Sequence, residues 1–182
     1  PKEIAGYKLF LGSTTGNLLL NDENSLQFFF KKSHNIPIVV HAESNEIIEK
    51  SAQFYRQKYP DFIPISCHHL IRSEDACFQS TSRIVDLAKQ TNTRLHIAHI
   101  STKKELDLLD KAEEEKTRAE EEAEYERKKN RLEQLIDYEH DATTKANYQK
   151  ELDKLVADYQ NTLDKRALQD KKEALKEQQD LL

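Results

Sequence analysis

The feature of this sequence that most limits its fold is the position of its chain-breaking residues. All three Gly and all four Pro lie within the first 64 positions, and the remaining 118 residues contain neither. Gly and Pro end helices and shape turns, so nothing in the second part has to interrupt a helix. The charge changes too: residues 1–105 carry 13 Lys and Arg against 11 Asp and Glu, whereas residues 106–182 carry 15 against 22. The sequence therefore predicts two unlike parts, 1–105 and 106–182.

Composition excludes several classes of protein. No apolar run approaches the ~20 residues of a membrane span, so no membrane partner is expected. The two cysteines, Cys67 and Cys77, are too few for a disulfide framework and indicate free thiols in a reducing compartment. A net charge of −5 gives no reason to expect a nucleic-acid partner. No signal-peptide pattern is visible, and we expect a cytoplasmic protein.

The first part alternates predicted strands and helices. Apolar runs at 7–11, 37–41 and 93–100 indicate buried strands. Helices are expected at about 25–34 after an Asn24 cap, at 44–59, and from a Ser73 cap to Lys89. Buried strands separated by helices favour parallel pairing with right-handed crossovers. Three strands are too few for a closed eight-stranded barrel, so the prediction is an α/β segment of a partial TIM barrel.

Polar residues lie where an α/β barrel places its chemistry, at the carboxyl ends of strands. Lys8 is in the first predicted strand, His41 ends the second, and His99 closes the third. Imidazole is a good ligand for Zn²⁺, and a lysine can become one if its amine is carbamylated. Because strand side chains alternate, His96 and His99 are expected on opposite faces, which favours His99. The alternative is a structural role in strand-end hydrogen bonding.

The other polar residues of this part receive structural interpretations. Glu43 and Asp75 are interpreted as solvated or capping groups. Arg72 is interpreted as support for helix or loop packing, and Cys77 as a small hydrophobic residue on a helix face. The run of Cys67, His68 and His69 is not a metal cluster, because adjacent side chains point in different directions.

Four motifs resemble those of one enzyme family. The segments GYKLFLGSTTGN, PIVVHAES, HHLIRSEDAC and TRLHIAHIST are similar in order and spacing to the central part of dihydroorotase, a cyclic amidohydrolase of the amidohydrolase superfamily. The resemblance covers about residues 4–109. It implies a distorted TIM barrel with one or two zinc ions and a reaction that opens or closes the ring amide of dihydroorotate in pyrimidine biosynthesis.

The resemblance assigns three metal residues and leaves others without a counterpart. It implies that Lys8 is the carbamylated lysine that bridges two zinc ions, and that His41 and His99 are the metal-binding histidines after the fifth and sixth barrel strands. The family's HxH motif, its substrate-binding Arg and its general-base Asp have no match. We therefore expect no catalytic residue and no catalysis from this chain alone. No cofactor-binding residue other than these metal ligands is predicted.

The second part indicates long helices. Thr102 and Glu105 form the T-x-x-E pattern of a capping box, and 37 of the 77 residues after position 105 are charged. Apolar residues recur at three-and-four spacing from Leu132 onwards, and Leu152, Val156, Tyr159 and Leu163 form a short heptad pattern. A weak helical segment at 140–144 predicts a bend.

Two arrangements fit this pattern. The first is an antiparallel helical hairpin; the second is a long helix in an intermolecular coiled coil, about 115 Å long if unbroken. The second part, about 110–182, resembles no family. Its functional interpretation is an element for self-association, with a solvated helix that has no dedicated partner as the alternative.

Overall fold

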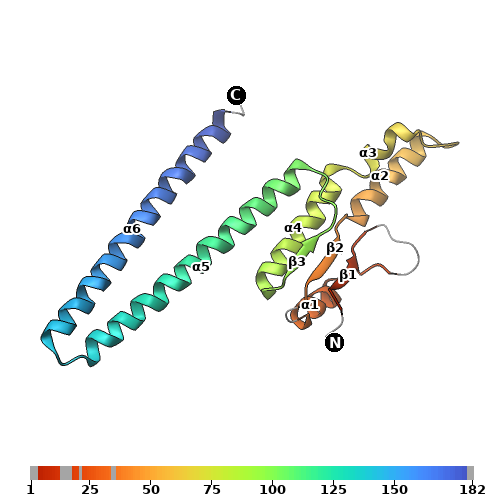
Figure 1. Cartoon of the computed structure of the whole chain (residues 1–182). Helices are drawn as coiled ribbons and strands as arrows, with labels where there is room; N and C mark the ends of the chain where they lie inside the picture. Colours follow the sequence, from red (N-terminus) through yellow and green to blue (C-terminus); the bar gives the residue numbers. More distant parts are fainter. Residues whose placement is uncertain (1–3, 13–17, 21, 34–35, 180–182) are drawn as a thin grey trace. The chain divides into compact units, whose positions relative to one another are not determined.

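The computed structural model describes residues 4–12, 18–20, 22–33 and 36–179, and Figure 1 shows its helices and strands. The chain divides into two compact units, Pro1–Glu114 and Glu115–Leu182. Within the described residues, the first unit contains the three strands, all of the shorter helices and the start of one long helix. The second consists of the later part of one long helix and a second long helix, so each unit is described by itself below.

Short strands and capped helices alternate through the first unit. The strands are β1 (Tyr7–Phe10), β2 (Ile38–His41) and β3 (Leu95–Ile97). The helices are α1 (Glu23–Lys32), α2 (Asn45–Lys58), the short turns η1 (Ile65–Cys67) and α3 (His68–Ile71), α4 (Glu74–Thr91) and the start of α5 (Lys103–Tyr138).

Side-chain caps explain where the helices begin. Ser44 accepts a hydrogen bond from the Ile47 amide at the start of α2, and the predicted Ser73 cap accepts one from the Ala76 amide at the start of α4. The predicted Asn24 cap is wrong, because Asp22 accepts from the Ser25 amide at 2.8 Å and starts α1 two residues earlier. Both residue types make good caps, and their side-chain geometry decides between them.

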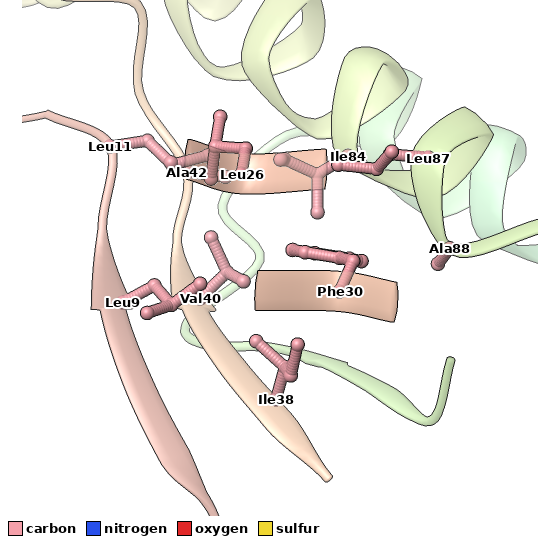
Figure 2. Close-up of a cluster of buried hydrophobic side chains, with 10 residues drawn as sticks. All are labelled: Leu9, Leu11, Leu26, Phe30, Ile38, Val40, Ala42, Ile84, Leu87 and Ala88. Atoms are coloured by element: carbon pink, nitrogen blue, oxygen red, sulfur yellow. The ribbon is translucent and has the colours of Figure 1, made fainter. Parts of the chain in front are cut away.

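The three strands form one parallel sheet in the order β1-β2-β3. In register, Lys8 pairs with Val39 and Phe10 with His41, while Val39 pairs with His96. One face of the sheet packs on α1 and α4 and forms the core (Figure 2), which is made of Leu9, Leu11, Leu26, Phe30, Ile38, Val40, Ala42, Ile84, Leu87 and Ala88. The alternation of strand side chains therefore puts Lys8, Phe10, Val39, His41 and His96 on the opposite face.

The third strand is shorter than predicted. It ends at Ile97 instead of continuing to residue 100, and the backbone bends at residues 98 and 99. His99 has a φ of 46°, in the left-handed region. The period-two argument applies only inside a strand, so its prediction that His96 and His99 face opposite ways has no basis beyond Ile97.

The predicted Thr102 cap at the start of α5 is confirmed, although Glu105 accepts from the Thr102 hydroxyl and not from its backbone amide. The Glu105 amide donates to the Thr102 hydroxyl at 3.2 Å, and that hydroxyl donates to the Glu105 carboxylate at 3.0 Å. Glu105 is only 3% exposed, and its other carboxylate oxygen accepts from the hydroxyl of Thr81 on α4 at 2.7 Å. This carboxylate thus joins the start of α5 to the middle of α4.

The second unit is a helical hairpin, the first of the two predicted arrangements. Helix α5 ends at Tyr138 and α6 runs over Ala142–Gln179 (Figure 1). Asp141 caps α6 by accepting from the Thr144 amide at 2.7 Å, as expected for the weak segment at 140–144.

Contacts across the hairpin show that its helices are antiparallel neighbours. The rings of Tyr125 and Tyr159 stack with centroids 3.8 Å apart. The Arg118 guanidinium donates to both carboxylate oxygens of Asp170, at 3.0 and 2.7 Å, and Arg166 pairs with Glu121. The partners lie further along α6 the earlier they lie in α5, from Tyr125 with Tyr159 to Arg118 with Asp170, so the two helices run antiparallel.

The seam between the hairpin helices differs in part from the predicted heptad. Leu152 and Tyr159 are half-buried, as predicted, together with Leu155. Val156 and Leu163 are 42% and 38% exposed, because they lie beside the seam and not within it. Among the described residues of this unit, none is fully buried. In the part of the chain that the structure describes, no helix is both long and apolar enough to cross a membrane.

Candidate metal site

Two of the predicted metal residues meet at one end of the sheet. His41 is the last residue of β2, and His99 lies two residues beyond the end of β3. The Nδ1 atom of His41 is 3.0 Å from the Nε2 atom of His99, and the ring centroids are 4.7 Å apart. A left-handed conformation costs a residue other than Gly roughly 1–3 kcal/mol. His99 has this conformation at the point where its ring contacts the ring of His41.

The third predicted residue, Lys8, is on the same face of the sheet but not in the same contact. Its side chain is exposed, and its Nζ lies 5.4 Å from the centroid of the Phe10 ring. That ring is in turn 6.4 Å from the ring of His41. The structure therefore brings together His41 and His99 and places Lys8 on their side of the sheet.

A buried carboxylate that the sequence interpretation missed lies behind His41. Glu43 is 8% exposed, and its Oε2 is 2.8 Å from the His41 Nε2. The Arg72 Nε donates to Oε1 of Glu43 at 3.0 Å, and the Nη2 of the same guanidinium pairs with Oε2. Glu43 is therefore not a solvated group, and Arg72 does more than support packing.

The sequence contained a signal for this contact. In the segment His41-Ala42-Glu43, Ala42 is buried in the core, so its two neighbours are on the other side. Strand-like alternation continued by two residues would have placed Glu43 beside His41. Gly12 makes room for this arrangement, because a Cβ there would lie 2.6 Å from the Glu43 carbonyl oxygen.

The remaining candidates have ordinary environments. Asp75 is paired with Lys104 at 3.1 Å on the surface. Cys67 is buried, whereas His68 and His69 are exposed. Burial, and after it the charge of Glu105, raises the pKa of the Cys77 thiol to about 11.

The pair of histidines fits part of a zinc site. Two nitrogen ligands of one tetrahedral zinc ion, each about 2.05 Å from the metal, lie about 3.3 Å apart. The separation of 3.0 Å between the two ring nitrogens is close to this spacing. Within the described residues, however, no group of three or more His, Cys, Asp and Glu side chains could hold a metal ion. The pair thus supplies two ligands, and any further ligand must be of another kind or come from elsewhere.

Several solved structures with a similar fold carry the name hydantoinase or dihydropyrimidinase. D-hydantoinase (dihydropyrimidinase) from a Thermus species has a TM-score of 0.54 at 20% identity, over 62% of this chain and 24% of its own. L-hydantoinase (dihydropyrimidinase) from Arthrobacter aurescens has a TM-score of 0.56 at 19% identity, over 61% of this chain and 25% of its own. At these identities the likeness establishes the fold of the matched part alone.

Curated relatives identify the kind of segment more closely. Dihydroorotase from Pyrococcus furiosus is 31% identical over 109 residues, which are 60% of this chain and 21% of the relative. Dihydroorotase from Methanosphaera stadtmanae is 24% identical over 110 residues, which are 60% of this chain and 24% of the relative. No family model matches.

The chain therefore contains a dihydroorotase-like segment that covers about 60% of its length. It spans between a fifth and a quarter of the length of these curated relatives.

Proposed function

We propose that the first unit is a metal-binding segment of a cyclic amidohydrolase of the dihydroorotase kind, with His41 and His99 as ligands of a zinc ion. The observation that carries this proposal is the 3.0 Å approach of their ring nitrogens at the carboxyl ends of adjacent parallel strands. Chemistry in α/β barrels is located at that end of the strands. The names of the curated relatives support dihydroorotate as the substrate.

The proposed roles follow from the chemistry of the site. His41 and His99 would hold the ion, and Lys8, which is exposed on the same face, would supply a further, oxygen ligand after carbamylation. A zinc ion bound there would polarise the ring carbonyl and lower the pKa of a bound water. The cyclic amide would approach from the sheet face that carries Lys8 and His41, opposite the hydrophobic core.

We infer that this chain alone does not turn over substrate. Residues 1–182 contain no HxH motif and no match to the family's general-base Asp. The three parallel strands would form part of a TIM barrel, and the remaining strands would have to complete both the barrel and the site.

We also propose a cytoplasmic location. Cys67 and Cys77 are free thiols, which suits a reducing compartment.

Zinc binding tests this function directly. Purified protein is titrated with Zn²⁺ against a chromophoric chelator, and ring opening of dihydroorotate is assayed in parallel. We expect one bound ion and no turnover. His41→Ala and His99→Ala should each weaken zinc binding at least about tenfold, because each removes a ligand.

His96→Ala is the matched control, since His96 is an exposed histidine on the same face of the sheet. It should bind zinc as the unaltered protein does. An unaltered protein that takes up no zinc, or a zinc affinity that does not depend on His41, would refute the proposed metal site. Measurable ring opening would refute the proposed inactivity.

A second proposed function belongs to residues 106–182, which we propose self-associate. Supporting it, the hairpin seam buries its residues only partly, and Leu168 and Leu175 are 56% and 60% exposed. Two-helix hairpins commonly bury their apolar residues by adding further helices to form a bundle. A second copy of the chain would supply two more.

A further inference from the structure

We propose that Glu43 and Arg72 are positioning residues that determine which ring nitrogen of His41 carries the proton, so that Nδ1 is left free to bind the ion. This inference rests on the proposed metal site and adds to it the residues that prepare a ligand. It starts from the chain of contacts Arg72–Glu43–His41–His99.

The direction of the hydrogen bonds follows from the chemistry of the partners. A carboxylate only accepts hydrogen bonds, and Arg72 only donates them. The His41 Nε2, 2.8 Å from a carboxylate oxygen, must therefore be the donor and carry the proton. In a neutral imidazole the other nitrogen, Nδ1, then holds the lone pair, and it is this atom that faces His99.

The carboxylate is held in place from several sides. Its residue is 8% exposed, and the Arg72 guanidinium contacts both of its oxygens. Arg72 follows the short helix α3, and its own amide bonds to the His68 carbonyl at 2.9 Å. The next residue after Glu43, Ser44, donates its amide to the Ala76 carbonyl of α4 at 2.9 Å. Glu43 therefore cannot readily turn away from His41 while these contacts last.

Removing Arg72 should release this arrangement. A buried carboxylate without its charged partner is strongly unfavourable, so Glu43 would turn towards water and leave the His41 Nε2 unpaired. The proton could then occupy either ring nitrogen of His41. Partners of this kind behind a metal-binding histidine commonly change metal affinity by about 10–100-fold when they are removed.

The test uses the full chain with ¹⁵N-labelled histidine and the variants Arg72→Ala and Glu43→Leu. NMR of the metal-free protein reports which nitrogen of His41 is protonated, and chelator competition reports the zinc affinity. In the unaltered protein we expect the Nε2-protonated form of His41. In both variants we expect a mixture of forms and a zinc affinity about 10–100-fold weaker.

Two further variants separate positioning from a general loss of structure. Arg118→Ala removes an Arg–carboxylate pair of the hairpin and should change neither signal. Arg72→Lys keeps one charged donor, and it should restore part of the affinity but not all of it, since the ammonium cannot bind both oxygens as the guanidinium does.

The outcomes distinguish this inference from the proposed function. An Nε2-protonated His41 that persists in both Arg72→Ala and Glu43→Leu would overturn the positioning role, whatever the zinc affinity. Absence of zinc binding in the unaltered protein would count against the proposed function alone, because the protonation pattern of the metal-free ring would still be measured. Loss of the dispersed amide spectrum would show that a variant has unfolded, and Arg72→Lys then takes its place in the comparison. If His41 in Arg72→Lys stays fully Nε2-protonated and the zinc affinity is unchanged, the proposal is overturned as well.

Discussion

Cys77 on α4 shows how the surroundings of a single residue set its chemistry. Burial is the main cause that raises the pKa of its thiol to about 11, and the charge of Glu105 adds to it. The thiolate is the reactive form, so Cys77 should react slowly at neutral pH. We predict that alkylation of Cys77, followed by mass spectrometry of its peptide, is slow at pH 8 and accelerates towards pH 11.

The same shift has a consequence for stability. An ordinary thiol of pKa 9.0 in the unfolded chain loses its proton before the folded one does. The unfolded state is therefore favoured as the pH rises from 9 towards 11, and this contribution to stability is constant below pH 9.

A native Cys77 that is alkylated at pH 8 as fast as it is in urea would contradict the predicted slow reaction of the buried thiol.

For Glu43, the sequence could predict one neighbour but not the other. Its position two residues after His41 indicates that the two side chains lie on the same side, but its partner Arg72 lies 29 positions further along the chain. Nothing in the local pattern links the two, since the contact depends on how α3 ends next to the end of β2. The carboxylate was consequently interpreted as a solvated or capping group.

At the scale of elements, the start of α5 depends on one buried carboxylate. The Glu105 carboxylate accepts a hydrogen bond from the hydroxyl of Thr81, a fully buried residue. The same carboxylate accepts one from the hydroxyl of Thr102, the cap of α5. We predict that Glu105→Ala lowers the free energy of unfolding by about 1–3 kcal/mol, because it leaves a buried hydroxyl without its acceptor and weakens the cap. Urea denaturation followed by circular dichroism measures this change.

Glu105→Gln is the matched comparison for that prediction. An amide oxygen can still accept from the Thr81 hydroxyl, so this variant should lose less stability than Glu105→Ala. Equal stability of Glu105→Ala and the unaltered protein would mean that the contact between α4 and α5 contributes nothing measurable.

At the scale of the whole molecule, no described residue of the hairpin unit is fully buried, so its apolar residues remain partly exposed. We predict that the chain forms a dimer or larger oligomer in light scattering coupled to size exclusion. Replacing the two exposed leucines in the double variant Leu168→Lys/Leu175→Lys should shift the chain towards the monomer, because it places charges on the proposed contact surface. Glu124→Lys, which changes an exposed residue of α5 paired within its own helix, is the control.

A chain that is monomeric at all measurable concentrations would contradict self-association.

The division into parts 1–105 and 106–182 remains a prediction. The compact units are divided along the chain between Glu114 and Glu115, within α5. Helix α5 has no breaker there, so neither composition nor a turn marks this boundary.

The sequence by itself determined the kinds of element and their order. Alternating apolar runs and capping residues located three strands and the helices between them, and the lack of breakers after residue 64 allowed the long helices. These features are local: propensity, capping and periodicity act within about four residues along the chain. The motifs around His41 and His99 also indicated that these two residues are candidate metal ligands.

Only the tertiary structure decided how those residues meet. The approach of His99 to His41 depends on the end of β3 and a left-handed backbone, and the Arg72–Glu43 contact joins elements distant in sequence. In the hairpin, the rings of Tyr125 and Tyr159 stack across the seam between the two helices. Such contacts arise from packing between elements, whose free energy depends on three-dimensional fit, and a one-dimensional pattern does not contain that fit.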